Sequence, residues 1–260
     1  MRRQGITDLK LSAYAGWRET RVDFLGGLPF LETLDLMTVG LRDVSPLYEL
    51  PNLRRLSISG VKAKVDFTKI PRLNHLGISW NHKLFASLLD CGNLHVLGLD
   101  RFTEKDLSSL RELTALNVLA LSYSKIESLR GIGRFSELRR LSLAVTNRIQ
   151  TLSGISACKE LVEVSVEAAK ILTDVDAVGD LPKLRTLFFT ACPKIESLQF
   201  ISKLSRLEYF ALLQTSRVSD GDLSGLSSLP KLKHVSFVDR KHYNRRNSAF
   251  PKNYKLMRPD

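Results

Sequence analysis

Cysteines are scarce in this chain of 260 residues, and long apolar runs are missing from it. The three cysteines, Cys91, Cys158 and Cys192, are an odd number, which argues against a disulfide framework and predicts reduced thiols in buried structural positions. No stretch reaches the roughly 18 apolar residues that a membrane span needs. The N-terminus has basic residues but no apolar run behind them, unlike a secretory leader. This predicts a cytoplasmic location, with the nucleus or a leaderless export route as alternatives.

Sequence motifs of enzymes are also missing. The chain has no zinc-protease helix motif, no paired Cys-x-x-Cys, no phosphate loop ending in Lys-Ser or Lys-Thr, and no nucleophile elbow. Its five histidines are scattered, and His75, His95 and Asp100 lack the spacing of metal ligands. We therefore expect no catalytic residues, no metal and no cofactor. An enzyme would need a closed pocket at those three residues.

A repeat dominates what the sequence does contain. The spacing L-x-x-L-x-L, with leucine-like residues at the fixed positions, occurs eleven times, and successive copies begin 20 to 25 positions apart. The copies begin at Ile6, Leu31, Leu53, Leu73, Leu94, Leu116, Leu138, Leu161, Leu184, Leu207 and Leu232. A period of this size predicts a solenoid, in which each unit buries its apolar face by stacking on its neighbours.

The spacing also predicts the parts of each unit. Alternation at the fourth and sixth positions is the period of a strand, so Leu97 and Leu99 point inward while Gly98 and Asp100 point outward. A second apolar set, such as Ile126, Leu129 and Ile132, returns the chain on the other side of the core. Because a unit of about 22 residues has no room there for a full helix, we expect 3₁₀ turns, single helical turns or extended segments.

This pattern resembles the leucine-rich repeat superfamily, in particular the short-repeat subclass of internalins and of a regulatory subunit of protein phosphatase 1. The stretch 116–135 carries the resemblance most fully, and the likeness covers roughly residues 6–240. It implies an α/β solenoid, a right-handed superhelix with a parallel sheet on the concave face and short segments on the convex face. It also implies that concave residues bind the partner.

One column departs from that family. Three residues after the last strand leucine, where the family places Asn or Cys, this chain has varied residues such as Val39, Asn81, Phe102 and Thr146. About half of the column could hydrogen-bond the turn. We therefore expect irregular turns, with some backbone groups satisfied by water or by neighbouring main chain.

We expect a single elongated domain over residues 1–260, since a solenoid grows by adding units and no Pro-, Gly- or Ser-rich linker interrupts it. Residues 1–30 form the N-terminal unit and cap, residues 31–238 form ten repeats, and residues 239–260 form a basic cap or tail.

The outward columns identify candidate binding residues for an unknown partner protein. The middle column is mostly Gly, Ala or Ser, so a floor of small side chains is expected. The bulkier or charged residues around it are Arg55, His75, Trp80, Arg101, Tyr123, Arg140, Phe188, Tyr209 and Leu213. Aromatic residues and Arg are enriched in interface hot spots. Two alternatives stand beside this interpretation: in turn packing, Trp80 could fold over the Gly77 and Gly98 floor with Tyr123 capping the turn beside it, and the chain's own tail could cover the apolar patch around Phe188.

The net charge of +12 is concentrated at the ends of the chain. Residues 239–260 carry +5 and residues 1–22 carry +3, which leaves the repeats close to neutral. An alternative function is therefore binding of nucleic acid or an anionic surface by the tail. Its candidate residues are Arg240, Lys241, Arg245, Arg246, Lys252 and Lys255. The competing interpretation is a cap, in which Tyr243 and Phe250 close the core.

Overall fold

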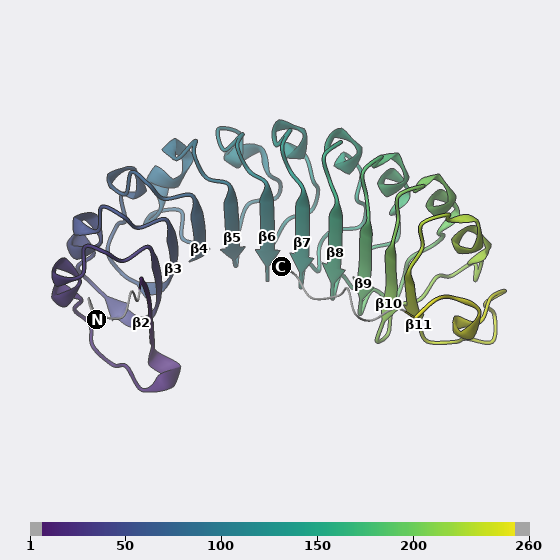
Figure 1. Ribbon diagram of the computed structural model, residues 1–260, viewed down its shortest axis with the longest axis horizontal. Coiled ribbons are helices and arrows are strands. Elements are labelled where there is room, and N and C mark those ends of the chain that lie inside the picture. The colour runs from purple at the N-terminus through teal and green to yellow at the C-terminus, as the bar shows by residue number, and fades with distance from the viewer. Residues whose placement is uncertain (1–6, 253–260) are drawn as a thin grey trace.

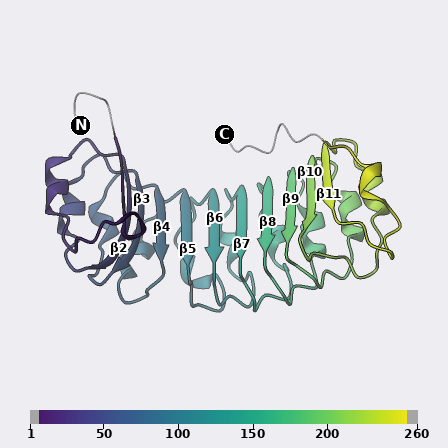
Figure 2. The ribbon, with the colours of Figure 1, turned by 90° about the horizontal axis from the view of Figure 1, so that it is seen from below.

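A computed structural model, which describes residues 7–252, has the form of an arch with a β-sheet along its inner side (Figure 1). The sheet contains eleven parallel strands that follow one another in chain order from β1 to β11. Figure 2 looks onto the inner, concave face, where the strands lie side by side. Short 3₁₀ segments form the outer side, as expected for repeats of this length.

The strands are β1 (Asp8–Ser12), β2 (Thr33–Leu41), β3 (Arg55–Val61), β4 (His75–Ser79), β5 (Val96–Asp100), β6 (Val118–Ser122), β7 (Arg140–Ala144), β8 (Glu163–Glu167), β9 (Thr186–Thr190), β10 (Tyr209–Leu213) and β11 (His234–Phe237). The 3₁₀ helices are η1 (Ala13–Ala15), η2 (Asp23–Gly27), η3 (Ser45–Glu49), η4 (Phe67–Lys69), η5 (Ala86–Asp90), η6 (Ser108–Leu110), η7 (Ile132–Arg134), η8 (Ile155–Ala157), η9 (Asp176–Asp180), η10 (Gln199–Lys203), η11 (Ser224–Ser228) and η12 (Asn247–Ala249).

Each unit closes its core with inward strand residues and a returning apolar set. In the unit of β6, Leu119 and Leu121 point inward and are buried, and the return buries Ile126, Leu129 and Ile132. These side chains belong to one hydrophobic cluster that runs along the arch. The predicted alternation of the strands is confirmed, because the period of the leucines fixes it, and of the three kinds of return that were expected the structure has 3₁₀ turns.

The turns after the strands differ from the prediction of irregularity. From β5 to β10, the second residue after the last inward strand residue is left-handed, with φ of 50° to 58°, at Arg101, Tyr123, Val145, Ala168, Ala191 and Gln214. In the first five of these, the backbone N–H donates to the carbonyl at the end of the next strand over 2.7–3.2 Å. The turns are therefore uniform, because neighbouring main chain satisfies them instead of a side-chain ladder.

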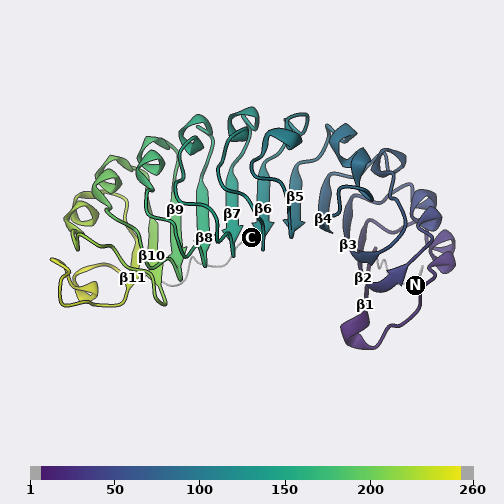
Figure 3. The same ribbon diagram turned by 180° about the vertical axis from the view of Figure 1, so that it is seen from behind.

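The N-terminal units are less regular. Between the pairs Met37–Ser59 and Leu41–Val61, three residues of β2 face one residue of β3, which is a β-bulge. The single residue is Gly60, with φ of 71°, and a methyl group there would overlap the Thr38 carbonyl oxygen. Only glycine fits both conditions. Figure 3 shows that η1 projects from this end of the arch.

The other end is closed by the segment that follows β11. Phe237 contacts the rings of Tyr243 and Phe250 at 5.8 and 5.9 Å, and both of those aromatics are buried. Lys252 forms an antiparallel bridge with His234, and the Val235 N–H donates to the Pro251 carbonyl at 3.1 Å. Residues 239–252 thus cap the core and the edge strand, as the competing interpretation of the tail expects.

Candidate functional site

The concave face presents the outward columns in register. One column runs from Thr33 through Arg55, His75 and Val96 to His234, and the next runs from Asp35 through Gly77 and Gly98 to Ser236. Eight of the ten residues from Asp35 to Ser236 are Gly, Ala or Ser, so the centre of the sheet is a floor of small side chains. Side chains of the flanking columns rise beside this floor.

A hollow of about 390 Å³ lies on this face over β2 to β5. Gly77 and Gly98, which face each other on β4 and β5, form its floor. Its polar or bulky lining residues are Thr33, Asp35, Arg55, Ser57, His75 and Val96. The hollow therefore brings together two of the predicted site residues, Arg55 and His75.

The charges around the hollow are arranged unevenly. Lys10 pairs with Asp35 at 3.1 Å, whereas the Arg55 side chain has no ion-pair or hydrogen-bond partner within residues 7–252. Burial, together with the charges of Arg55 and His95, lowers the pKa of His75 below its ordinary value of 6.5. His75 is therefore mostly neutral at neutral pH, and its Nδ1 lies 2.6 Å from the Asn74 Oδ1.

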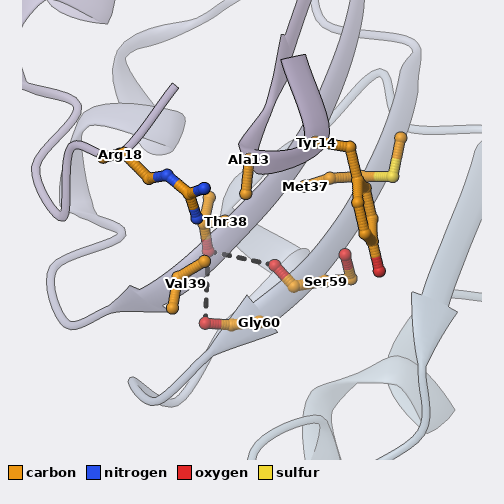
Figure 4. A pocket seen from close by; sticks show the side chains of 8 residues that line it. All are labelled: Ala13, Tyr14, Arg18, Met37, Thr38, Val39, Ser59 and Gly60. Atoms are coloured by element: carbon orange, nitrogen blue, oxygen red, sulfur yellow. Dashed lines mark hydrogen bonds between the residues drawn. The ribbon is translucent and has the colours of Figure 1, made fainter. Parts of the chain in front are cut away.

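A second hollow, of about 550 Å³, lies at the strand ends near the β-bulge (Figure 4). Its lining comes from η1, from the loop after η1 and from the ends of β2 and β3 (Figure 4). Tyr14 is 94% exposed here, and Val39 is also exposed. The Thr38 hydroxyl donates to the carbonyls of Ser59 and Gly60 at 3.0 and 3.1 Å, which holds the bulge. Sequence reasoning missed this hollow, because only the register shift creates it.

The predicted cluster of Trp80, Arg101 and Tyr123 lies at the rim of β4 to β6, and its members differ in environment. Trp80 is half-buried, and its ring meets Phe102 edge-on at 5.1 Å. Arg101 is exposed beside Asp100, at 3.5 Å, and Tyr123 is 62% exposed. Trp80 thus packs on a turn, but against Phe102 and not over the glycine floor, while Arg101 and Tyr123 are accessible.

The C-terminal group of predicted residues is also divided. Tyr209 is 8% exposed and Phe188 is half-buried, whereas Leu213 is 38% exposed. Arg140 is exposed and lies 3.7 Å from Glu163 on the next strand. Leu213 is therefore the most accessible of the predicted residues on β9 and β10.

The basic tail residues fall into two groups, those that hydrogen-bond within the cap and those that are exposed to solvent. Arg240 donates to the Ser216 carbonyl at 3.3 Å, and the Lys252 ammonium donates to the Val235 carbonyl at 2.5 Å, so both take part in the cap. Lys241, Arg245 and Arg246 are exposed. Lys255 lies outside the described residues.

The described residues show little reactive chemistry. Within residues 7–252 no group of three His, Cys, Asp or Glu side chains could hold a metal ion. Burial raises the pKa of Cys91, Cys158 and Cys192 to about 11, which leaves each thiol protonated at neutral pH. In the same range, no helix is long and apolar enough to cross a membrane.

Comparison with known proteins identifies the fold. No protein-family model matches the sequence, and no curated protein matches it. An internalin, InlF, of Listeria monocytogenes superposes with a TM-score of 0.56 at 18% identity, over 86% of this chain and 78% of the internalin. The leucine-rich repeat domain of the type III effector XopL gives a TM-score of 0.58 at 18% identity, over 77% of this chain and 75% of that domain.

A plant peptide hormone receptor in complex with RGF2 gives a TM-score of 0.51 at 18% identity, over 82% of this chain and 40% of the receptor. Together with the parallel sheet and the 3₁₀ returns, these likenesses confirm the leucine-rich repeat fold that the resemblance implied. At such identities they establish the fold alone.

Proposed function

We propose that this protein is a non-enzymatic interaction module that binds a partner protein on the concave face of the solenoid. The observation that carries the proposal is the concave hollow over β2 to β5, which combines a floor of glycine with a guanidinium that has no partner within residues 7–252. A shallow, open surface of this kind suits the recognition of an extended chain more than catalysis, which favours an enclosed site. The likeness to a receptor whose structure contains its peptide hormone supports this kind of use.

The accessible residues along the rim would extend that contact. Tyr123, which follows β6 at the middle of the arch, and Leu213, on β10 toward its C-terminal end, are exposed side chains, and Arg101 and Arg140 add charge. Exposed aromatic and apolar side chains supply the buried area of most protein interfaces. Trp80 would act indirectly, since its packing on Phe102 supports the turn beside Tyr123.

A photo-crosslinking experiment tests which face of the solenoid binds the partner. It is placed at Ser142, on the concave floor, and in a matched variant at Ser136, which is exposed outside the strands. In lysate of the source organism, a partner should be captured from Ser142 and not from Ser136. Capture from Ser136 alone would contradict the proposal.

The captured partner, once purified, allows a measurement of affinity. Tyr123→Ala with Leu213→Ala should weaken binding at least tenfold, since both side chains are accessible and neither is part of the buried core. Glu137→Ala, an exposed position outside the strands, serves as the control and should leave the affinity unchanged.

The tail supports a second candidate function, binding of an anionic surface, through the exposed Lys241, Arg245 and Arg246. Within residues 7–252 the strand faces supply no matching row of cations, because Arg55 stands alone and Lys10 and Arg140 are paired with carboxylates. Retention on heparin at low salt should fall sharply in a variant with glutamine at the three tail positions. Unchanged retention would exclude this use of the tail.

A further inference from the structure

Glycines at the floor of the concave hollow are not required by the backbone. Gly77 and Gly98 lie within strands, and neither has a positive φ. A Cβ on Gly98 would meet the Gly77 Cα at 3.8 Å, and a Cβ on Gly77 would meet the Ser57 hydroxyl oxygen at 3.6 Å, which are ordinary contacts. Glycine inside a strand weakens it and often marks a place where another chain or ligand comes close to the backbone.

Arg55 stands beside this floor as an exposed charge that has no ion-pair partner within residues 7–252. Within residues 7–252, the outward strand positions carry three Lys or Arg residues, and two of them have carboxylate partners, Lys10 with Asp35 and Arg140 with Glu163. Arg55 has none, and the residues opposite it in the sheet are Thr33 and His75. A planar guanidinium in this position is suited to a carboxylate from another molecule.

The hollow also contains an acceptor without a donor. The Asp35 Oδ1 is buried and has no hydrogen-bond partner within residues 7–252, while its Oδ2 binds Lys10. A buried acceptor without a partner costs free energy, so the ion pair with Lys10 is what holds this carboxylate in the lining of the hollow. Arg55 and Asp35 thus lie in one hollow, whose lining also includes Thr33, Ser57, His75, Val96 and the two glycines.

We propose that this hollow is a subsite for an acidic residue of the partner protein together with an adjacent bulky apolar side chain. The Arg55 guanidinium binds the carboxylate, and the glycine floor receives the apolar group. This inference rests on the concave-face binding proposed above and states the chemistry that the partner must carry there.

Hydrocinnamate, which carries a carboxylate and a phenyl ring, is a minimal probe of this subsite. In an NMR titration it should shift the amides of Gly77 and Gly98 and the ring of His75. Hydrocinnamamide has the same shape without the charge, and it should bind about fivefold more weakly, as expected for the loss of one exposed ion pair. Added salt should weaken the binding of hydrocinnamate only.

Two substitutions test the charge and the floor separately. Arg55→Gln should reduce the affinity for hydrocinnamate about fivefold, while Arg140→Gln, the matched change on β7, should not alter it. Gly98→Val should abolish the shifts by filling the hollow, while Ala120→Val, in the same column on β6, should leave them. Because a Cβ fits at Gly98, this variant should fold and keep its thermal midpoint, which a melting curve verifies.

Several outcomes would overturn the subsite: no amide shift in the hollow, equal binding of the acid and the amide, or equal effects of Gly98→Val and Ala120→Val. The proposed function is tested independently. If hydrocinnamate fails to bind while Tyr123→Ala with Leu213→Ala still weakens partner binding, the subsite is wrong and concave binding stands. If the probe binds but crosslinks arise only from Ser136, the partner binds elsewhere.

Discussion

The two halves of the arch are built from the same repeat but satisfy their backbones differently. From β5 to β10 every strand has five residues, and every following turn contains one left-handed residue at the same repeat position. In the N-terminal part, β2 has nine residues and β3 has seven, and a β-bulge separates their ends. Both hollows lie toward this end, one between η1 and the ends of β2 and β3 and the other over β2 to β5. The bulge creates the hollow beside η1, whereas the concave hollow owes its depth to the glycines of two regular strands.

Among the changes that test this difference, Gly60→Ala should have the largest effect on the free energy of unfolding. Gly60 occupies the repeat position at which the uniform part holds Ala168 in a left-handed conformation, but the bulge of β2 brings the Thr38 carbonyl against it. The added methyl group should lower the free energy of unfolding by about 2 kcal/mol, because the chain must move or the strain must remain. Urea denaturation would measure the loss. Hydrogen exchange should localise it to β2 and β3.

A matched change in the uniform part provides the control. Ala168→Gly leaves that turn free of new contacts, so its effect on the free energy of unfolding should stay within about 1 kcal/mol. If Gly60→Ala were equally mild, the bulge would not constrain the N-terminal strands.

Glu208→Gln tests how much the ion pairs of Glu208 stabilise the regular, C-terminal part of the arch. The Glu208 side chain is 9% exposed, and it accepts hydrogen bonds from Arg185 at 2.8 and 3.0 Å and from Lys233 at 2.8 Å. Loss of its charge should cost about 1–2 kcal/mol of unfolding free energy at neutral pH. Glu163→Gln, which alters an exposed pair with Arg140, should cost less than about 0.5 kcal/mol.

The cost of Glu208→Gln should depend on pH. Arg185, followed by Lys233, lowers the pKa of Glu208 below its ordinary value of 4.5. The stabilisation is therefore complete above the unfolded-state pKa and disappears as the pH falls through the lower folded-state value. Urea denaturation of wild type and variant should converge below that value. A constant difference down to strongly acidic pH would show that the carboxylate charge is not responsible.

Particular residues show how far the sequence alone can lead. The inward positions, such as Leu119 and Leu121, determine which residues face the concave side, because strand alternation has a fixed period. This was enough to place Arg55 beside His75. The left-handed turns were not predictable, because the residues there are of five types and none is Gly or Asn. Hydrogen bonds to the next strand impose the conformation.

The remaining features depend on contacts between distant segments. The β-bulge arises from three residues facing one across two strands, and no local pattern in 37–41 indicates it. The sequence left open whether Trp80 belongs to an interface or packs on a turn, and it did not identify Phe102 as the packing partner. The sequence therefore predicts which residues face outward, but not which of them remain accessible to a partner.

Val145→Gly should produce a smaller effect of opposite sign. Val145 is β-branched and has φ of 54°, a conformation that disfavours such side chains. Glycine removes this strain, and after its own entropic cost the free energy of unfolding should rise by about 0.5 kcal/mol. Val118→Gly, at an ordinary extended position of β6, should instead lower it. Thermal unfolding of both variants gives the comparison, and a loss in Val145→Gly would mean that its side chain contributes packing that outweighs the strain.

The smallest expected effect is a shift in the pKa of His75 when the charge of Arg55 is removed. Burial lowers the pKa of His75, and the positive charge of Arg55 lowers it further. Arg55→Gln should therefore raise the pKa of His75, which remains below its ordinary value because burial persists. An NMR titration of the imidazole would measure this, with Arg140→Gln as a control that leaves it unchanged. A bound carboxylate should act in the same direction as Arg55→Gln, since it neutralises the same guanidinium. If His75 responds to neither, Arg55 is already screened by solvent, and the irregular units differ from the uniform ones in shape alone.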